Sequence, residues 1–280
     1  MRLVSFAIGP KDSYGVLSGD GVIDIGMRFG DRWPSLRAAL AAGALAEIRN
    51  FADGRSPDHA TKKVGWRPVL PDCDKVMCIG RNYKDHLEET GAEVPANPRV
   101  FLKHRTAIVA HNEPIIRPRL SDKFDYEGEL TVVIGRAGRH IPVDRALDHV
   151  AGYTLLNDAS VRDYQQHSLF AGKNFERTSG FGPCLTTTDD IPDPSKLTLL
   201  TRLNGIEVQR SGTDMLIYDI PFLISYLSRL TTLLPGDSVA TGTPGGVGSR
   251  RKPPLWMKPG DVIEVEINEI GVLRNPVIAE

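Results

Sequence analysis

The segment Asp125–Ile134 reads DYEGELTVVI, a charged start followed by an apolar run. If this segment is extended, Glu127 and Glu129 project from one face because strand side chains alternate, and Gly128 between them leaves room for close approach. The two carboxylates would then converge. A solvated edge strand would tolerate the same pair, and that is the commoner meaning of an isolated Glu-x-Glu.

A third carboxylate closes the next apolar run of the chain. Asp158 follows Val150–Leu156, at the point where a helix over Val161–Ser168 is predicted to begin. Taken alone, Asp158 could be the N-cap of that helix. Together with Glu127 and Glu129 it would form a hard-oxygen ligand set, which suits Mg²⁺ or Mn²⁺ better than zinc.

A histidine and a glutamate form a second candidate constellation. His86 and Glu89 lie three residues apart in NYKDHLEE, so they share one face if this segment is helical. A histidine oriented by a carboxylate can act as a general base and activate water. The alternative is a charge pair on a surface helix.

The remaining sequence predicts a mostly β fold with many turns. The chain has 27 Gly and 20 Pro, which punctuate short apolar runs instead of gathering in one linker. Helices are predicted at Tyr83–Thr90, Val161–Ser168 and Ile220–Leu230. Strands are predicted at Phe101–Leu102, Leu130–Ile134, Val150–Leu156, Thr198–Leu203, Ser238–Ala240 and Val262–Ile267.

The first 70 residues predict a small α+β domain of their own. Leu3–Ile8 and Tyr14–Ile25 are strand-like, and Pro34–Phe51 has helical spacing with Pro34 at its start. The polar, Pro-containing segment Asp53–Asp74 then separates this part from the rest. We therefore expect an α+β, mostly β fold with a small N-terminal domain (1–70) and a catalytic domain (71–280).

Composition excludes several classes of partner. The 280 residues contain 34 Lys and Arg against 35 Asp and Glu, a net charge of −1, which offers no field for nucleic acid or an anionic membrane surface. The apolar stretches are far shorter than the ~20 residues that cross a bilayer, and the N-terminus does not resemble a signal peptide. We expect a cytoplasmic protein whose three cysteines are reduced.

Familiar catalytic motifs are absent from the sequence. It contains no G-x-G-x-x-G, no H-E-x-x-H and no G-x-S-x-G. The glycine-rich segment Thr241–Gly248 lacks the lysine of a phosphate loop, so it is either a tight turn between strands or a loop that contacts a ligand.

An ordered set of short motifs resembles the fumarylacetoacetate hydrolase family over about residues 75–280. The motifs are Gly80-Arg-Asn-Tyr83 with His86 and Glu89, Phe101-Leu-Lys103, Asp125–Leu130, Asn157-Asp158, Arg162-Asp163 with Gln165, Gly172-Lys173 through Gly182-Pro183, Thr213-Asp-Met215, and Pro235-Gly-Asp237 leading into Thr241–Gly248. The resemblance implies a twisted β-roll core, Mg²⁺ or Mn²⁺ as cofactor, and a homodimer.

The resemblance also implies a role for individual residues. Glu127, Glu129 and Asp158 match the family's metal carboxylates, Lys173 matches a lysine near the metal, and His86 and Glu89 match the water-activating pair. The residues implied for substrate binding are Arg81, Tyr83, Lys103, Arg105, Arg162, Gln165 and, against the substrate carboxylate, Thr243. Many relatives have Phe-Leu-Lys-Pro where this chain reads Phe101-Leu-Lys103-His104-Arg105. This basic cluster is expected either to lie at the pocket rim and hold a second carboxylate or to be solvated surface charge.

The expected function is metal-dependent hydrolysis of a carbon–carbon bond in a 2,4-dioxo acid. An acylpyruvate such as fumarylpyruvate or maleylpyruvate would yield pyruvate and a carboxylic acid, since the metal stabilises the enolate released. Oxaloacetate decarboxylation and isomerisation or decarboxylation of a 2-hydroxymuconate-type acid are the alternatives, because they use the same enolate. A non-catalytic, metal-stabilised binding protein is disfavoured because His86 and Glu89 are both present.

Overall fold

The apolar run that follows Glu129 forms the centre of the molecule. In the computed structural model, which describes residues 1–280, β11 (Gly128–Ile134) is buried along its whole length. It pairs antiparallel with β12 (Val150–Asn157) on one side and with β17 (Ser238–Ala240) on the other. A strand buried on both faces needs a nearly continuous apolar sequence, which Leu130–Ile134 provides.

These strands belong to a sheet of 12 strands. The main path runs β4 (His59–Ala60), β3 (Gly21–Asp24), β2 (Lys11–Ser18), β1 (Arg2–Ile8), β14 (Ser179–Thr187), β12, β11, β17, β6 (Val76–Gly80) and β7 (Arg99–Lys103). Off this path, β5 (Gly65–Trp66) pairs with β1, and β8 (Ile108–Val109) pairs with β14.

A second sheet of five strands packs against β11. A Cβ atom at Gly128 would lie 2.2 Å from Oγ1 of Thr201 and 3.1 Å from Cγ1 of Val265, both on this second sheet. Gly128 therefore permits the close approach of the two sheets, while its neighbours Glu127 and Glu129 point to the opposite face. The order is β16 (Ile206–Gly212), β15 (Thr198–Leu203), β18 (Val262–Ile267), β19 (Gly271–Ala279) and β9 (Ile115–Arg117); β10 (Phe124–Asp125) and β13 (Ser160–Val161) form a separate pair.

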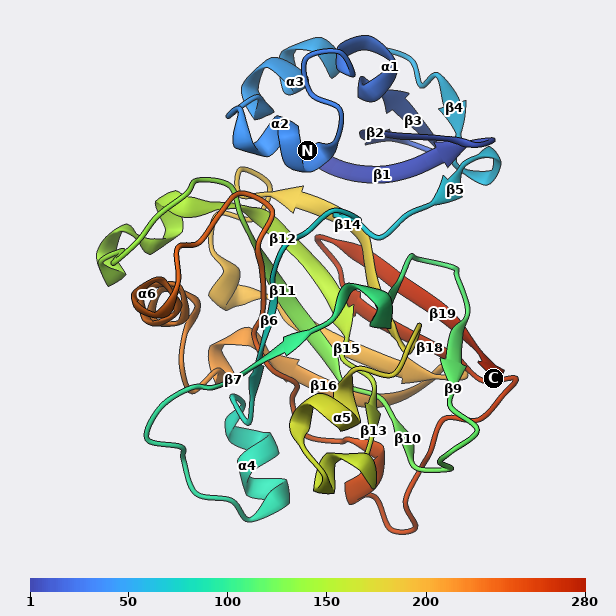
Figure 1. Cartoon of the computed structure of the whole chain (residues 1–280), viewed down its shortest axis with the longest axis vertical. Coiled ribbons are helices and arrows are strands. Elements are labelled where there is room, and N and C mark those ends of the chain that lie inside the picture. Colours follow the sequence, from blue (N-terminus) through green and yellow to red (C-terminus); the bar gives the residue numbers. More distant parts are fainter.

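The N-terminal residues form a lobe at the top of the molecule (Figure 1). Its helices α1 (Ile25–Phe29), α2 (Leu36–Ala41) and α3 (Leu45–Ala52) pack over β1–β3, with Leu36, Leu40 and Ile48 buried. Because β1 pairs with β14, the lobe continues the large sheet. The domain division at residue 70 stays a prediction.

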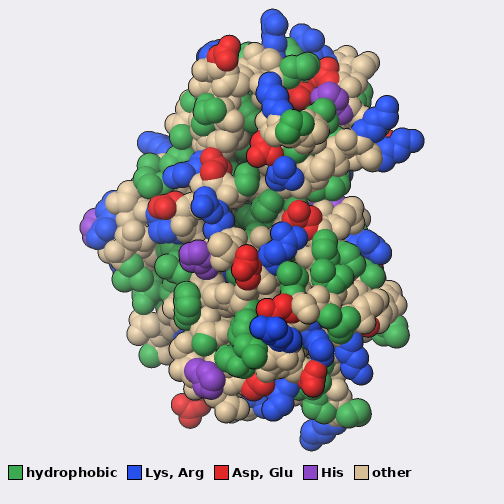
Figure 2. Space-filling view, turned by 45° about the vertical axis from the view of Figure 1, so that its right-hand side comes forward, with side chains coloured by type: hydrophobic (Ala, Val, Ile, Leu, Met, Phe, Trp, Pro, Cys, Tyr) green, Lys and Arg blue, Asp and Glu red, His purple; other side chains and the backbone are tan.

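Three further helices flank the sheets below this lobe (Figure 1). They are α4 (Lys84–Thr90), α5 (Leu169–Lys173) and α6 (Ile220–Leu230). Asp219 caps α6 by accepting a hydrogen bond from the amide of Phe222. No helix is long and apolar enough to span a membrane. Basic and acidic side chains are interspersed over the face shown in Figure 2, in line with the net charge of −1.

The predicted α+β, mostly β class is confirmed, and the predicted strands of the main part are present. The predicted helix over Val161–Ser168 is wrong. Val161 pairs with Phe124 in β13, and α5 begins only after Ser168, whose hydroxyl accepts a hydrogen bond from the amide of Ala171.

Two N-terminal elements are each divided by a turn. The stretch Pro34–Phe51 forms two helices instead of one, with Gly43 at φ 66° between them. Tyr14–Ile25 similarly contains two strands, joined by a turn with Gly19 at φ 55°. Both glycines occupy the left-handed region, which side chains other than glycine rarely adopt.

Candidate active site

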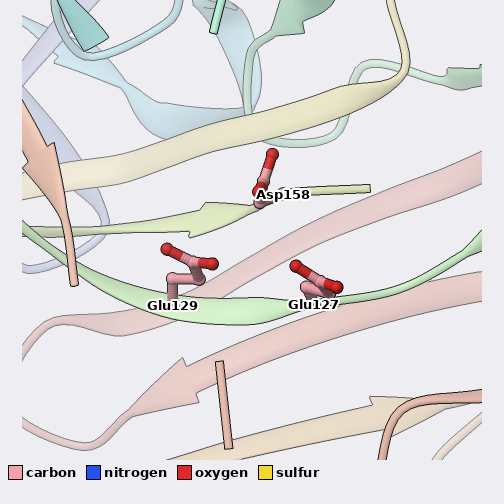
Figure 3. A group of neighbouring side chains, drawn as sticks. All are labelled: Glu127, Glu129 and Asp158. Carbon is pink, nitrogen blue, oxygen red and sulfur yellow. The ribbon is translucent and has the colours of Figure 1, made fainter. Parts of the chain in front are cut away.

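Three carboxylates meet at one end of the β11–β12 pair. Gly128 lies opposite Asn157 in this ladder, so Glu127 and Glu129 face Asp158, the residue after β12. Figure 3 shows the Glu127 and Glu129 side chains on the same side of their ribbon. One carboxylate oxygen from each residue lies within 4.8 Å of the other two. This is the arrangement predicted from strand alternation.

All three carboxylates are buried, which decides between the interpretations that the sequence left open. Glu127 and Glu129 are only 7% and 2% exposed, so they do not lie on a solvated edge strand. Asp158 is fully buried and caps no helix. Its amide donates a 2.7 Å hydrogen bond to the carbonyl of Glu127, which joins the two segments directly.

Buried cations compensate two of the three carboxylates. Nζ of Lys173 lies 2.5 Å from an oxygen of Glu127 and 2.5 Å from an oxygen of Asp158. Lys103 lies 2.5 Å from the other oxygen of Asp158, and Arg162 lies 2.7 Å from Glu127. Burial alone would raise the pKa of Glu127, but Lys173 and Arg162 lower it to about 2.

Glu129 has no cationic partner. Its carboxylate accepts a 3.0 Å hydrogen bond from the amide of Gly242. Burial, followed by the charges of Asp158 and Glu127, raises its pKa well above the ordinary value. An ionised Glu129 in this position therefore needs positive charge beside it.

The charges of the site fit a divalent cation. Arg162, which is half-buried, also pairs with Asp125 at 2.7 Å, so four buried carboxylates, including Asp125, lie among three cations, Lys103, Lys173 and Arg162. One negative charge is left over, and Glu129 is the residue without a partner. Three buried carboxylate ligands with one uncompensated negative charge suit Mg²⁺ or Mn²⁺.

A polar cavity of about 320 Å³ opens beside the carboxylates. Only four of its 17 lining residues are hydrophobic, so it suits a polar ligand. It contains eight of the residues predicted for the site: Arg81, His86, Glu127, Glu129, Arg162, Gln165, Lys173 and Thr243.

The predicted histidine–glutamate pair forms on α4. Nδ1 of His86 lies 3.4 Å from Oε2 of Glu89, and His86 is buried at the cavity wall. The other oxygen of Glu89 accepts a hydrogen bond from the amide of Gly246 at 3.0 Å. The pair thus joins α4 to the glycine-rich segment, with His86 buried and Glu89 exposed.

The glycine-rich segment after β17 holds carboxylates with its backbone. The amides of Gly242, Gly246 and Gly248 donate to Glu129, Glu89 and Asp125. Thr243 lines the cavity, and its Oγ1 accepts a 2.8 Å hydrogen bond from Gln209. The Thr243 hydroxyl hydrogen is therefore available to a ligand.

Three predicted substrate-binding residues do not line the cavity. Tyr83 is fully buried in the main hydrophobic cluster, and Lys103 is buried against Asp158. Arg105 lies in a short 3₁₀ helix beyond the end of β7, on the exposed surface. The basic rim expected at Lys103 and Arg105 is thus not found there, because β7 turns Lys103 inward and ends before Arg105.

Sequence reasoning missed two arginines of the cavity, Arg99 and Arg250. Arg99, Phe101 and Lys103 alternate along β7, so they share one face of the strand, and Arg99 and Phe101 line the cavity. This alternation could have indicated Arg99. Arg250 ends a 3₁₀ helix, Gly248–Arg250, in a region of irregular backbone, where no periodic signal exists.

Comparison with known families and sequences adds independent evidence. Residues 75–278 match the family model described as fumarylacetoacetate (FAA) hydrolase C-terminal. The oxaloacetate tautomerase fahd2, mitochondrial, of Xenopus laevis is 36% identical over 288 residues, which covers 99% of this chain and 90% of the relative.

Solved structures share the whole fold. A fumarylacetoacetate hydrolase from psychrophilic Exiguobacterium antarcticum superposes with a TM-score of 0.86 at 34% identity, and each chain is fully covered. The maleylpyruvate hydrolase from Sphingobium sp. SYK-6, in complex with manganese (II) ion and pyruvate, has a TM-score of 0.83 at 28% identity and covers 100% of this chain and 99% of its own.

Proposed function

The chain belongs to the fumarylacetoacetate hydrolase family, and we propose that it is a divalent-metal-dependent enzyme that acts on a small 2-oxo acid. One observation carries this proposal. Glu127 and Glu129 of the buried carboxylate triad line the same polar cavity as His86, which Glu89 orients. A cation site and a general base thus face one ligand space.

The triad Glu127, Glu129 and Asp158 would hold the cation. When bound, Mg²⁺ or Mn²⁺ supplies the positive charge that stabilises the enolate of a 2-oxo acid. Lys173 offsets negative charge beside this position, and Thr243 offers its hydroxyl to the substrate carboxylate. The neighbour that contains manganese and pyruvate supports both a divalent cation and a 2-oxo acid.

Hydrolysis of an acylpyruvate such as fumarylpyruvate or maleylpyruvate is the first candidate reaction. His86 would take a proton from water, and the resulting hydroxide would attack the carbonyl carbon C4. The C3–C4 bond breaks, its electron pair remains with pyruvate as an enolate, and the acyl group leaves as a carboxylic acid. The enolate then takes up a proton. The intact His86–Glu89 pair supports this reaction, because water attack requires a positioned base.

Tautomerisation of oxaloacetate is the second candidate. The oxaloacetate tautomerase of Xenopus laevis, which aligns with 99% of this chain, favours this reaction. His86 would here exchange a proton with C3 of oxaloacetate, and no bond between carbon atoms would break. Decarboxylation of oxaloacetate uses the same enolate, as does isomerisation or decarboxylation of a 2-hydroxymuconate-type acid. One substrate panel can test all of these reactions.

A substrate panel tests the proposal. Acylpyruvates, oxaloacetate and 2-hydroxymuconate-type acids should be assayed with Mg²⁺ and with Mn²⁺, with His86→Ala as the control variant. Release of pyruvate from an acylpyruvate supports the first candidate. Acceleration of keto–enol exchange alone supports the second. If no acid is turned over with either metal, the proposal is overturned.

A homodimer and a cytoplasmic location stay predictions from the sequence. Light scattering of the purified chain would test the first, since a homodimer predicts twice the 30.7 kDa of one chain. Cell fractionation would test the second.

A further inference from the structure

Three arginines gather at the edge of the candidate active site. In the β6–β7 ladder Gly80 lies opposite Arg99, so Arg81, the next residue, lies beside Arg99. Arg250 reaches the same cavity from the end of its 3₁₀ helix. All three residues are exposed at its rim, whereas Glu127 and Glu129 are buried in its wall.

These arginines have no partner in the protein. No side-chain nitrogen of Arg81, Arg99 or Arg250 forms an ion pair or a hydrogen bond, whereas Arg162 pairs with Asp125 and Glu127. Desolvation, followed by the charges of Arg99 and Arg250, lowers the pKa of Arg81. The cluster is therefore electrostatically unfavourable when empty, and an anion bound among the three would relieve the repulsion.

The backbone of Arg81 adds a second sign of a functional position. Its φ of 58° lies in the left-handed region, which costs a residue other than glycine on the order of 1 kcal/mol. Glycine would remove this strain, yet the position holds an arginine that lines the cavity. The strain is tolerated where the side chain serves a ligand.

We propose that Arg81, Arg99 and Arg250 form a second anion subsite, which binds the far carboxylate of a 2-oxo dicarboxylate. This inference rests on the proposed function, because the 2-oxo acid end of the substrate is assigned to the carboxylate triad. Guanidinium groups suit the task, since each can bind a carboxylate through two parallel hydrogen bonds. The subsite would make the enzyme selective for diacids over monoacids of the same length.

Matched substrates test the selectivity. Succinylpyruvate and butanoylpyruvate differ only by a terminal carboxylate in place of a methyl group. The wild type should prefer the diacid. Arg99→Gln and Arg250→Gln should each lower kcat/KM for the diacid about 10-fold and change the monoacid less than about 2-fold, as expected for one charge-assisted hydrogen bond. Arg99→Lys and Arg250→Lys should retain part of the preference. Arg119→Gln is the matched control, because Arg119 is exposed, lies outside the cavity and has no side-chain partner in the protein.

A binding measurement separates this inference from the proposed function. Calorimetry on the Mn²⁺-loaded protein should compare 2-oxoheptanedioate, which has the length of succinylpyruvate, with 2-oxoheptanoate, which lacks the second carboxylate. The two Gln variants should weaken the binding of 2-oxoheptanedioate alone. If no acid is turned over but this pattern appears, the reaction assignment fails and the subsite stands. If the variants weaken the binding of both ligands equally, or of neither, the subsite is overturned, whatever the activity of the protein.

Discussion

Nδ1 of His86 lies 3.4 Å from Oε2 of Glu89, and the second oxygen of Glu89 is held by the amide of Gly246. The histidine is therefore oriented by a carboxylate that is itself anchored to the segment following β17. This relationship joins α4 to the segment after β17, and in the proposed reaction His86 would be the base that water attack requires.

Removing the base should separate hydrolysis from metal binding. His86→Ala should lower acylpyruvate hydrolysis by about 10²-fold or more, the usual contribution of a general base. Binding of Mn²⁺ should be unchanged, because Glu127, Glu129 and Asp158 remain. Glu89→Gln should show a milder loss, since Glu89 orients the imidazole without taking the proton. Near wild-type kcat in His86→Ala would show that another group is the base.

Glu129→Gln should stabilise the metal-free protein at neutral pH. The pKa of Glu129 is raised in the folded state. Its contribution to folding stability is therefore fully present below pH 4.5, its ordinary pKa, where the carboxyl is protonated, and is lost as the pH rises through the folded-state pKa. In chelator, the melting temperature of the variant should therefore exceed that of the wild type at pH 7.5. The exposed Glu88→Gln should show no such gain.

The wild type and Glu129→Gln should respond differently to metal. Mn²⁺ should raise the melting temperature of the wild type, because it binds only the folded triad, and should leave Glu129→Gln nearly unchanged. An equal rise in both proteins would mean that the cation binds elsewhere.

Loss of Lys173 should destabilise the fold. Lys173→Met removes a cation that lies 2.5 Å from both Glu127 and Asp158, and leaves buried carboxylates undercompensated. We expect unfolding in urea to become easier by about 3 kcal/mol, as for other broken buried pairs. Lys196→Met removes an exposed surface pair and should change little. Similar effects of the two substitutions would contradict the charge balance of the site.

Gly128 should not tolerate a side chain. Alanine there would place Cβ 2.2 Å from Oγ1 of Thr201, so Gly128→Ala should lower stability by about 1–3 kcal/mol, as overpacking does. It should also weaken Mn²⁺ binding by displacing Glu127 and Glu129. Gly65→Ala, where the nearest atom is 3.7 Å away, is the control, and Thr201→Ala should partly rescue Gly128→Ala. Equal stability of Gly128→Ala and Gly65→Ala would refute the close packing of Gly128 against Thr201.

The sequence predicts those parts of the site that depend on local periodicity. Strand alternation places Glu127 and Glu129 on one face, and helical spacing pairs His86 with Glu89, as the structure shows. Burial of the triad was not predictable from Glu-x-Glu alone, because it depends on Arg162, Lys173 and the amide of Gly242, which come from later segments and contact the two glutamates.

Features created by long-range pairing were not predictable. Arg81 and Arg99 meet only because β6 and β7 pair with Gly80 opposite Arg99. Val161 becomes a strand residue only because Phe124 pairs with it, which overrides its helical spacing. Arg105 follows a strand but lies beyond its end, so closeness in sequence did not bring it to the cavity.

Turnover of a 2-oxo acid before and after metal removal tests the central claim most directly. The protein should be treated exhaustively with chelator, and kcat/KM for maleylpyruvate and oxaloacetate should then be measured before and after addition of Mn²⁺. The carboxylate triad predicts that the activity toward the true substrate disappears in chelator and returns with Mn²⁺, and that Glu127→Ala, Glu129→Ala and Asp158→Ala do not recover. Full activity after complete removal of the metal would contradict the account.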